Sequence, residues 1–139
     1  MMTGYYLDTS VALRILFHHS QAAAEWFDGI TTNPNEFIVS SRILRTEMTR
    51  ALRRTSQPLE RRSEVLDYVG TLPVDHAVLQ EAEALVPHVK TLDAIHLASA
   101  LRSGLEDAVI ATHDRNMINV AGQLGFSVHD PVTDDPGRT

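Results

Sequence analysis

Four acidic residues stand where a folded chain could gather them into one site: Asp8, Glu47, Asp93 and Asp114. Asp8 ends the short apolar stretch GYYLD, and Asp114 follows DAVIATH, so both are predicted at the carboxyl ends of strands. Glu47 lies about a turn and a half into the helix predicted after EFIVSS, and Asp93 lies in the first turn of a helix predicted within residues 90–104. A helix that follows a parallel strand begins at that same edge, so one edge of a sheet could collect all four acids.

Such a cluster opposes folding unless something offsets its charge. Two carboxylates 4 Å apart repel by about 1 kcal/mol in water and about 4 kcal/mol at an effective dielectric constant of about 20. The cluster is tolerable if a cation neutralises it or if some members hold protons. The ligands are all oxygen and the chain has no cysteine, so the expected cation is Mg²⁺ or Mn²⁺. Such an ion suits phosphodiester hydrolysis, because it can polarise the phosphate and hold a water for in-line attack.

Each acid also has an ordinary structural explanation. Asp8 and Asp114 are suitable caps for the helices that follow them, and Asp93 suits the positive end of its own helix. Glu47 could form a surface ion pair with Arg50, one turn away.

Three further residues have open roles. Asp75, in PVDHA, reads as a helix cap but also stands at the end of a possible strand. Thr91 is a candidate cap for the helix predicted within residues 90–104. His96, one turn after Asp93 on that apolar helix, is either packed in the core or supports Asp93.

Short apolar runs alternate with helical patterns along the chain. This alternation predicts an α/β fold whose mainly parallel sheet is covered on both faces. Thr9 or Ser10 is expected to cap the first helix, and Gly29 to close the second. Strands are expected over residues 4–8, 36–41, 72–75 (a weak candidate), 107–112 and 126–130, and helices over 9–17, 22–29, 42–54, 59–72, 76–85, 115–125 and most of 90–104, with Gly104 as the stop.

The size and composition indicate one soluble domain. A chain of 139 residues can bury a sufficient core, and we expect one domain over residues 1–130 with a flexible, turn-rich tail over 131–139. We expect no secretory signal and no membrane span. The lack of cysteine fits a reducing compartment, and the expected location is the cytoplasm.

The charge is unevenly distributed. The net charge of −6 argues against a simple basic nucleic-acid-binding protein. Nevertheless seven of the twelve basic residues lie between positions 42 and 62, and all seven are arginines. Arginine suits phosphate recognition, although most of these side chains taken singly are explained by a solvated helix face. Arg50, Arg53 and Arg54 are the candidates to contact RNA or an acidic partner.

Four segments resemble a known family when they are read in order: YLDTSVAL, RTEM, TLDAIHLASAL and VIATHDRNM. They resemble the PIN-domain ribonucleases, in particular the VapC toxins of bacterial toxin–antitoxin pairs, over nearly the whole chain from Tyr6 to Val128. The resemblance implies a three-layer α/β/α sandwich with a central parallel sheet. It also implies an endoribonuclease that uses Mg²⁺ or Mn²⁺ to cut single-stranded or loop RNA, a small antitoxin partner and a homodimer.

The resemblance assigns roles residue by residue. Asp8, Glu47, Asp93 and Asp114 match the metal-binding acids. Thr112 matches a hydroxyl residue that orients the last acid, and Ser10 matches a small hydroxyl position near the first. Asn116 stands where some relatives carry a further acid, so a second metal ion is in doubt.

Other functions fit the residues less well. A receiver-type phosphoacceptor module needs a pair of acids after the first strand and a lysine after a late strand. This chain has the single Asp8, and its one lysine, Lys90, precedes a helix. A metal phosphohydrolase built on His113 and Asp114 needs further histidines at ligand positions. A catalytically inactive PIN-like binding module remains as the alternative.

Overall fold

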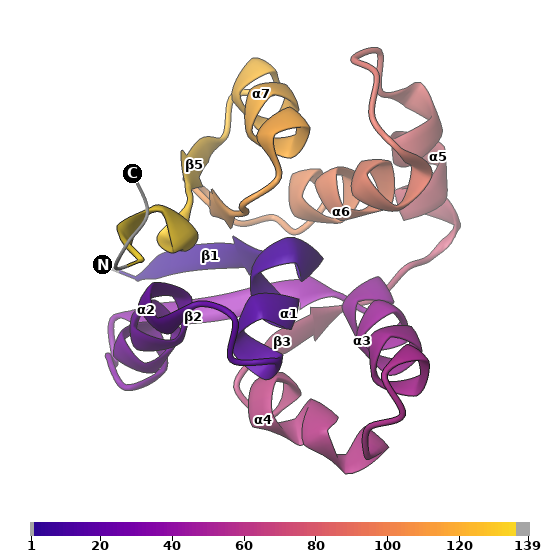
Figure 1. Ribbon diagram of the computed structural model, residues 1–139. Coiled ribbons are helices and arrows are strands. Elements are labelled where there is room, and N and C mark those ends of the chain that lie inside the picture. The colour runs from indigo at the N-terminus through magenta and orange to yellow at the C-terminus, as the bar shows by residue number, and fades with distance from the viewer. Residues whose placement is uncertain (1, 136–139) are drawn as a thin grey trace.

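A five-stranded parallel sheet forms the centre of the protein in the computed structural model, which describes residues 2–135 (Figure 1). The strand order is β3-β2-β1-β4-β5, and every neighbouring pair is parallel. The predicted mainly parallel sheet is therefore confirmed. The strands are β1 (Thr3–Leu7), β2 (Glu36–Ser41), β3 (Gly70–Leu72), β4 (Val109–Ala111) and β5 (Ser127–His129).

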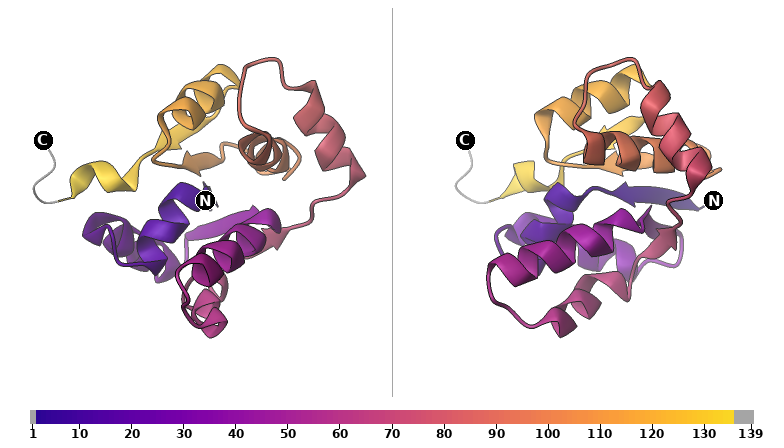
Figure 2. Two further views of the ribbon diagram at one scale, coloured as in Figure 1. Left: turned by 45° about the vertical axis from the view of Figure 1, so that its right-hand side comes forward. Right: turned by 90° about the vertical axis from the view of Figure 1, so that its right-hand side faces the viewer.

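Helices cover both faces of the sheet, which gives the α/β/α sandwich (Figures 1 and 2). Successive residues of β1 serve opposite faces, as strand geometry requires: Leu7 packs with α1 to α4, whereas Tyr6 packs with α6 and α7. Helix α5 packs against α6. The helices are α1 (Thr9–Leu16), α2 (Gln21–Thr31), α3 (Ile43–Arg54), η1 (Leu59–Arg62), α4 (Ser63–Leu66), α5 (His76–Ala84), α6 (Thr91–Leu101), α7 (Arg115–Gln123) and η2 (Pro131–Asp134).

The segment predicted as one helix over residues 59–72 folds differently. It forms the short helices η1 and α4, and then the edge strand β3. Strand β3 pairs with β2 through Val39 opposite Gly70 and Ser41 opposite Leu72, so it lies two residues earlier than the weak strand predicted over 72–75. Pairing satisfies the backbone groups that the outer edge of β2 would otherwise expose, and this gain outweighs the local helical pattern.

Several helix ends also differ from the predictions. Helix α2 continues through Gly29 to Thr31. The N-cap of α1 is Asp8, so neither Thr9 nor Ser10 occupies the cap position. The N-cap of α6 is Lys90, and Thr91 is already inside the helix.

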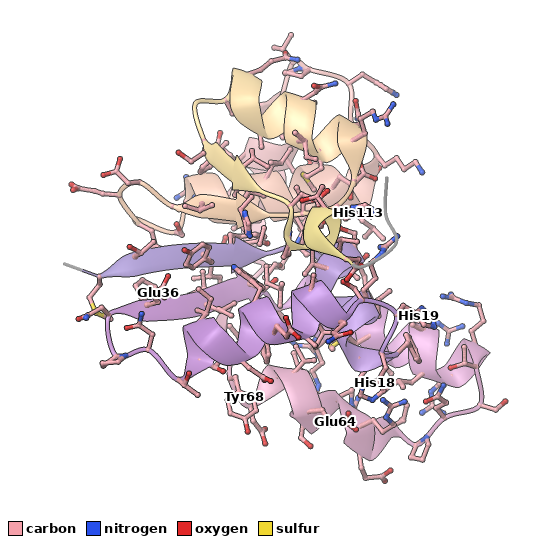
Figure 3. The ribbon with its side chains drawn as sticks, turned by 60° about the vertical axis from the view of Figure 1, so that its left-hand side comes forward. His18, His19, Glu36, Glu64, Tyr68 and His113 are labelled. Atoms are coloured by element: carbon pink, nitrogen blue, oxygen red, sulfur yellow. The ribbon has the colours of Figure 1, made fainter. Side chains whose placement is uncertain are left out.

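The chain after residue 130 forms a further short helix, η2. It packs against α2 and buries Val132, which is 2% exposed, in the core on that face. Asp135 accepts hydrogen bonds from Ser20 Oγ (2.9 Å) and from the backbone N–H of Ala22 (2.8 Å) at the start of α2. The flexible tail over residues 131–139 stays a prediction, and residues 136–139 lie outside the described part of the chain. Figure 3 shows η2 beside His113.

The strand order reverses between β1 and β4, because the chain leaves β1 for β2 on one side and returns to β4 on the other. The crevice at the carboxyl ends of these two strands is where open parallel sheets bind ligands. Asp8 directly follows β1, and Asp114 follows β4 by two residues, so both acids stand at this crevice. Within residues 2–135, no helix has the length and apolar character needed to cross a membrane.

Candidate active site

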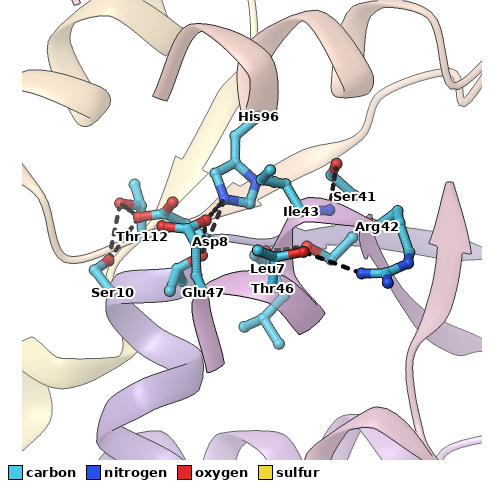
Figure 4. Close-up of polar contacts among 12 residues, drawn as sticks. Leu7, Asp8, Ser10, Ser41, Arg42, Ile43, Thr46, Glu47, His96 and Thr112 are labelled. Atoms are coloured by element: carbon cyan, nitrogen blue, oxygen red, sulfur yellow. Dashed lines mark hydrogen bonds and ion pairs between the residues drawn. The ribbon is translucent and has the colours of Figure 1, made fainter. Parts of the chain in front are cut away.

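Asp8 is held at the crevice by two hydroxyl groups (Figure 4). Its Oδ2 accepts hydrogen bonds from Ser10 Oγ (2.7 Å) and Thr112 Oγ1 (2.8 Å), and Asp8 itself is 3% exposed. Although Asp8 occupies the N-cap position of α1, its side chain makes no capping hydrogen bond. Ser10 Oγ in turn accepts the backbone N–H of His113 (3.1 Å), and Thr112 Oγ1 accepts that of Asp114 (3.1 Å). The carboxylate is therefore fixed by β1, α1 and the segment after β4 together.

Glu47 lies on α3 and reaches the same site from the other side of Asp8 (Figure 4). Its Oε1 accepts a hydrogen bond from Thr9 Oγ1 (2.7 Å) and lies 2.8 Å from His96 Nε2. Among the described residues, Glu47 forms no ion pair with Arg50, so the surface-pair explanation fails. This carboxylate is therefore the point where residues of α1, α3 and α6 meet.

Asp93 is half-buried in the first turn of α6, where it faces the other acids. Burial, followed by the negative charges of Asp8 and Asp114, raises the pKa of Asp93 to about 6. Glu47 acts in the same direction, so the structure brings the other three predicted acids within electrostatic reach of Asp93. The helix terminus would lower this pKa, because positive N-terminal charge favours a carboxylate. Loss of water and like charge therefore outweigh the helix dipole at this position.

Asp114 combines a structural contact with exposure to the site. It is the N-cap of α7, and its Oδ1 accepts the backbone N–H of Met117 at 2.9 Å, so the capping explanation is correct. Asn116 is exposed, and its amide nitrogen donates to the carbonyl of His88 (3.1 Å) in the loop before α6. Asn116 therefore joins α7 to that loop, and it makes no described contact with the four acids.

The four acids form an open cluster. No three acidic or histidine side chains among residues 2–135 converge closely enough to enclose a metal ion directly. Each of the four carboxylates nevertheless keeps at least one oxygen without a hydrogen bond from any described residue. This donor set fits Mg²⁺, which binds proteins through one or two carboxylates and retains several of its waters.

The arginines between positions 42 and 62 divide into two groups. In η1, Arg61 pairs with Glu64 (3.0 Å) and also binds Gln57 and the carbonyl of Leu16, and Arg62 binds the Leu59 carbonyl (3.0 Å) and Thr49 (2.9 Å). Arg42, before α3, binds Thr46 (3.2 Å). The side chains of the other group are exposed and form no hydrogen bond or ion pair with a described residue. This group consists of Arg45, Arg50, Arg53 and Arg54, all on α3.

The structure defines the contacts of Asp75 and of the histidines. Asp75 is the N-cap of α5 and accepts the backbone N–H of Val78 (2.9 Å), and it is not among the charges that act on Asp93. His113 lies 2.9 Å from Asp130, and Figure 3 shows His18 and His19 on a different part of the surface. The histidines thus do not assemble the phosphohydrolase site considered above.

Sequence reasoning missed the polar chain behind Glu47. His96 is 1% exposed; its Nδ1 lies 2.8 Å from the hydroxyl of Tyr6 and its Nε2 contacts Glu47. It also acts on Asp93, where it opposes the rise in pKa, so both the core position and the support of Asp93 are correct. Burial raises the pKa of the Tyr6 hydroxyl above its usual value. Thr9 was considered only as a helix cap. The available signal was the presence of a histidine and a threonine at buried positions of two otherwise apolar helices.

Comparison with known proteins identifies the family. The PIN domain family model matches residues 5–123. Ribonuclease VapC46 of Mycobacterium tuberculosis is 33% identical over 132 residues, which cover 94% of this chain and 99% of the relative.

Solved structures share the fold. A toxin–antitoxin complex from Klebsiella pneumoniae contains a chain that superposes with a TM-score of 0.67 at 21% identity, covering 91% of this chain and 97% of that one. VapBC2 from Rickettsia felis, bound to a DNA fragment from its promoter, gives a TM-score of 0.70 at 12% identity, with 91% and 98% coverage. The family match spans the strands and helices that carry all four acids. The chain therefore belongs to the PIN domain family, among whose members its relatives are the ribonucleases named VapC.

Proposed function

We propose that this protein is a Mg²⁺- or Mn²⁺-dependent endoribonuclease that cleaves single-stranded or loop RNA as the toxin of a toxin–antitoxin pair. The observation that carries the proposal is the effect of Asp8, Asp114 and Glu47, together with burial, on the pKa of Asp93, which rises to about 6. A carboxylate with its pKa raised by like charge and burial is typical of a functional site. The name of the relative, ribonuclease VapC46, gives the reaction class.

The side chains have separate tasks in this proposal. Asp8, Glu47, Asp93 and Asp114 would hold the ion, which when bound supplies positive charge to the phosphate and orders water near it. Ser10 and Thr112 keep Asp8 in place through hydrogen bonds of 2.7 and 2.8 Å. Preset carboxylates lower the reorganisation needed when the charge at the phosphate increases.

Exposed arginines beside the acids are proposed to bind the RNA backbone. On α3, Arg50 and Arg54 follow Glu47 by three and seven residues, so they lie on its side of the helix. Arg53 points about 120° away around the helix axis. This geometry favours Arg50 and Arg54 as phosphate contacts and leaves Arg53 for the solvent or a protein partner.

A cleavage assay with a panel of structured RNAs tests the function. The wild-type protein is expected to cut at least one RNA in Mg²⁺ or Mn²⁺ and to lose this activity in EDTA. Asp8→Asn, which keeps the size of the side chain, is expected to reduce cleavage by orders of magnitude while the fold remains intact by circular dichroism. Equal cleavage by the two proteins, or cleavage that persists in EDTA, would overturn the proposal.

The partners are proposed on the same basis. The similar fold in a complex titled as toxin–antitoxin supports a small antitoxin protein as the partner, and we also propose a homodimer in the cytoplasm. Light scattering of the purified protein measures the oligomeric state. Coexpression with the candidate antitoxin should yield a complex that lacks RNA cleavage.

One observation favours a second candidate, a catalytically inactive PIN-like binding module. The described acids do not enclose a metal ion directly. Under this candidate the protein would bind RNA without cutting it, and the EDTA arm of the assay would change nothing.

A further inference from the structure

A buried line of polar groups runs from the sheet to Glu47. It starts at the backbone N–H of Ser41, which donates to the hydroxyl of Tyr6 (3.1 Å). The Tyr6 hydroxyl lies 2.8 Å from Nδ1 of His96, and Nε2 of His96 lies 2.8 Å from Oε1 of Glu47. Tyr6, His96 and Ser41 are each at most 2% exposed, so water does not replace these contacts.

We assign the donors and acceptors along this line in one direction. With the Ser41 N–H donated to the Tyr6 oxygen, the Tyr6 proton is assigned to the contact with Nδ1 of His96. The imidazole then carries its hydrogen on Nε2, which lies 2.8 Å from Oε1 of Glu47 and 2.9 Å from Thr9 Oγ1. Thr9 Oγ1 donates to the same Oε1 atom at 2.7 Å, so one oxygen of Glu47 is bound twice and Oε2 is left for other ligands.

We infer that His96, oriented by Tyr6, is a positioning residue that fixes Glu47 at the acid cluster. This inference rests on the function proposed above. Burying two polar side chains, Tyr6 and His96, in a core is costly unless their partners are present, and a bonded network makes its members rigid. The one member of the line that is not buried is Glu47, which faces the other acids. The network therefore holds the Glu47 carboxylate in a fixed position at the acid cluster.

A purely structural role for His96 makes a different forecast. If the imidazole served only the packing of α6, any side chain that kept the core stable would leave Glu47 unaffected. If His96 positions Glu47, the position of Glu47 depends on a donor atom at the place of Nε2. The variants His96→Gln and His96→Asn distinguish the two roles, because the glutamine amide reaches the place of Nε2, whereas the asparagine amide reaches only that of Nδ1.

The experiment measures Mn²⁺ binding by electron paramagnetic resonance in the absence of RNA, with Mn²⁺ alone as the probe. His96→Asn is expected to weaken binding 10- to 100-fold, the range for residues that orient metal ligands, and to reduce RNA cleavage in parallel. His96→Gln, which retains a donor for Glu47, is expected to stay within about threefold of the wild type. If His96→Asn binds Mn²⁺ as tightly as the wild type, or if His96→Gln is impaired equally, the inference is overturned.

The tautomer of His96 can be measured on the wild-type protein, so this test does not depend on the folding of a variant. In metal-free protein labelled with ¹⁵N at histidine, the imidazole of His96 should show the Nε2–H tautomer with a slowly exchanging proton. The Nδ1–H tautomer or a doubly protonated ring would overturn the inference. Failure of the proposed function looks different, because the wild type would then neither bind Mn²⁺ nor cleave any RNA.

Discussion

Replacing Asp93 by asparagine should make the metal-free protein more stable. The pKa of Asp93 rises from the ordinary value of 3.8 to about 6 in the folded protein, so folding disfavours its ionised form. A folded-state pKa above the unfolded one means that stability is complete below about pH 4 and falls as the pH rises towards 6. Asparagine has the same size and no charge, so it avoids this loss.

The magnitude follows from the shift. Two pH units correspond to about 3 kcal/mol, but the side chain is only half-buried, and solvent screening reduces the expected gain to about 1 kcal/mol at pH 7.5. For a chain of this size, that gain corresponds to a rise in melting temperature of about 4 °C. At pH 4 the difference between the two proteins should nearly vanish.

Magnesium should reverse the order of stability of the wild type and Asp93→Asn. At a concentration 100 times the dissociation constant, wild-type protein gains about 2.7 kcal/mol from binding. A variant that binds about 100-fold more weakly gains only about 0.4 kcal/mol, so the wild type becomes the more stable protein. Thermal melting of both proteins in EDTA and in excess Mg²⁺, at pH 7.5 and at pH 4, covers all four conditions.

A matched control removes a charge elsewhere. Glu83→Gln on the exposed surface of α5 lowers the net negative charge equally and should change the melting temperature by less than about 1 °C in EDTA. The reasoning is refuted if Asp93→Asn is less stable than wild type at pH 7.5 in EDTA, since the carboxylate would then support the fold.

Three other changes test separate parts of the molecule. Thr112→Val removes a hydroxyl that donates to Asp8 and accepts the Asp114 N–H, so the Mn²⁺ affinity measured by calorimetry should fall about tenfold. Thr112→Ser should preserve the affinity. Equal affinities of the two variants would show that the hydroxyl is dispensable. Charge reversal of Arg50 and Arg54 should weaken RNA binding by Asp8→Asn protein and flatten its salt dependence, with Arg53→Glu as the control; the same loss in the control would point to net charge alone. Val132→Ala should lower the free energy of unfolding by about 1–2 kcal/mol in urea titrations, because the side chain is fully packed, and an unchanged midpoint would show that η2 does not contribute to stability.

The sequence gives the place of each acid relative to a predicted element, because each stands at a short distance from the end of one. Asp8 directly follows β1, Asp114 stands three residues after the end of β4, and a parallel sheet has one carboxyl edge, so topology brings both to the same crevice. Their role as a metal site stays a prediction. The segment 59–72 was harder, because its apolar residues satisfy a helical pattern while β2 still lacks a partner strand. Pairing between strands is not visible in local periodicity.

The network behind Glu47 shows a second limit. Tyr6 and His96 are 90 residues apart, and no spacing rule connects a tyrosine in a strand to a histidine on a distant helix. Similarly, a single buried side chain, Val132, anchors η2, and the polar composition around it indicates a loose tail. Both features depend on long-range contacts that a single sequence does not encode in pattern.

The pairing of β1 with β4 sets an order of events during protein synthesis. Asp8 is bound by Thr112, which is made 104 residues later, and β4 is the strand that completes the crevice. A ribosome adds about 5–20 residues per second, so about 5–20 s pass between these two residues. Towards the end of that interval the nascent chain carries Asp8, Glu47 and Asp93 but has neither β4, the second strand that pairs with β1, nor Asp114. A chain that stops before β4 therefore lacks Asp114 and cannot assemble the site.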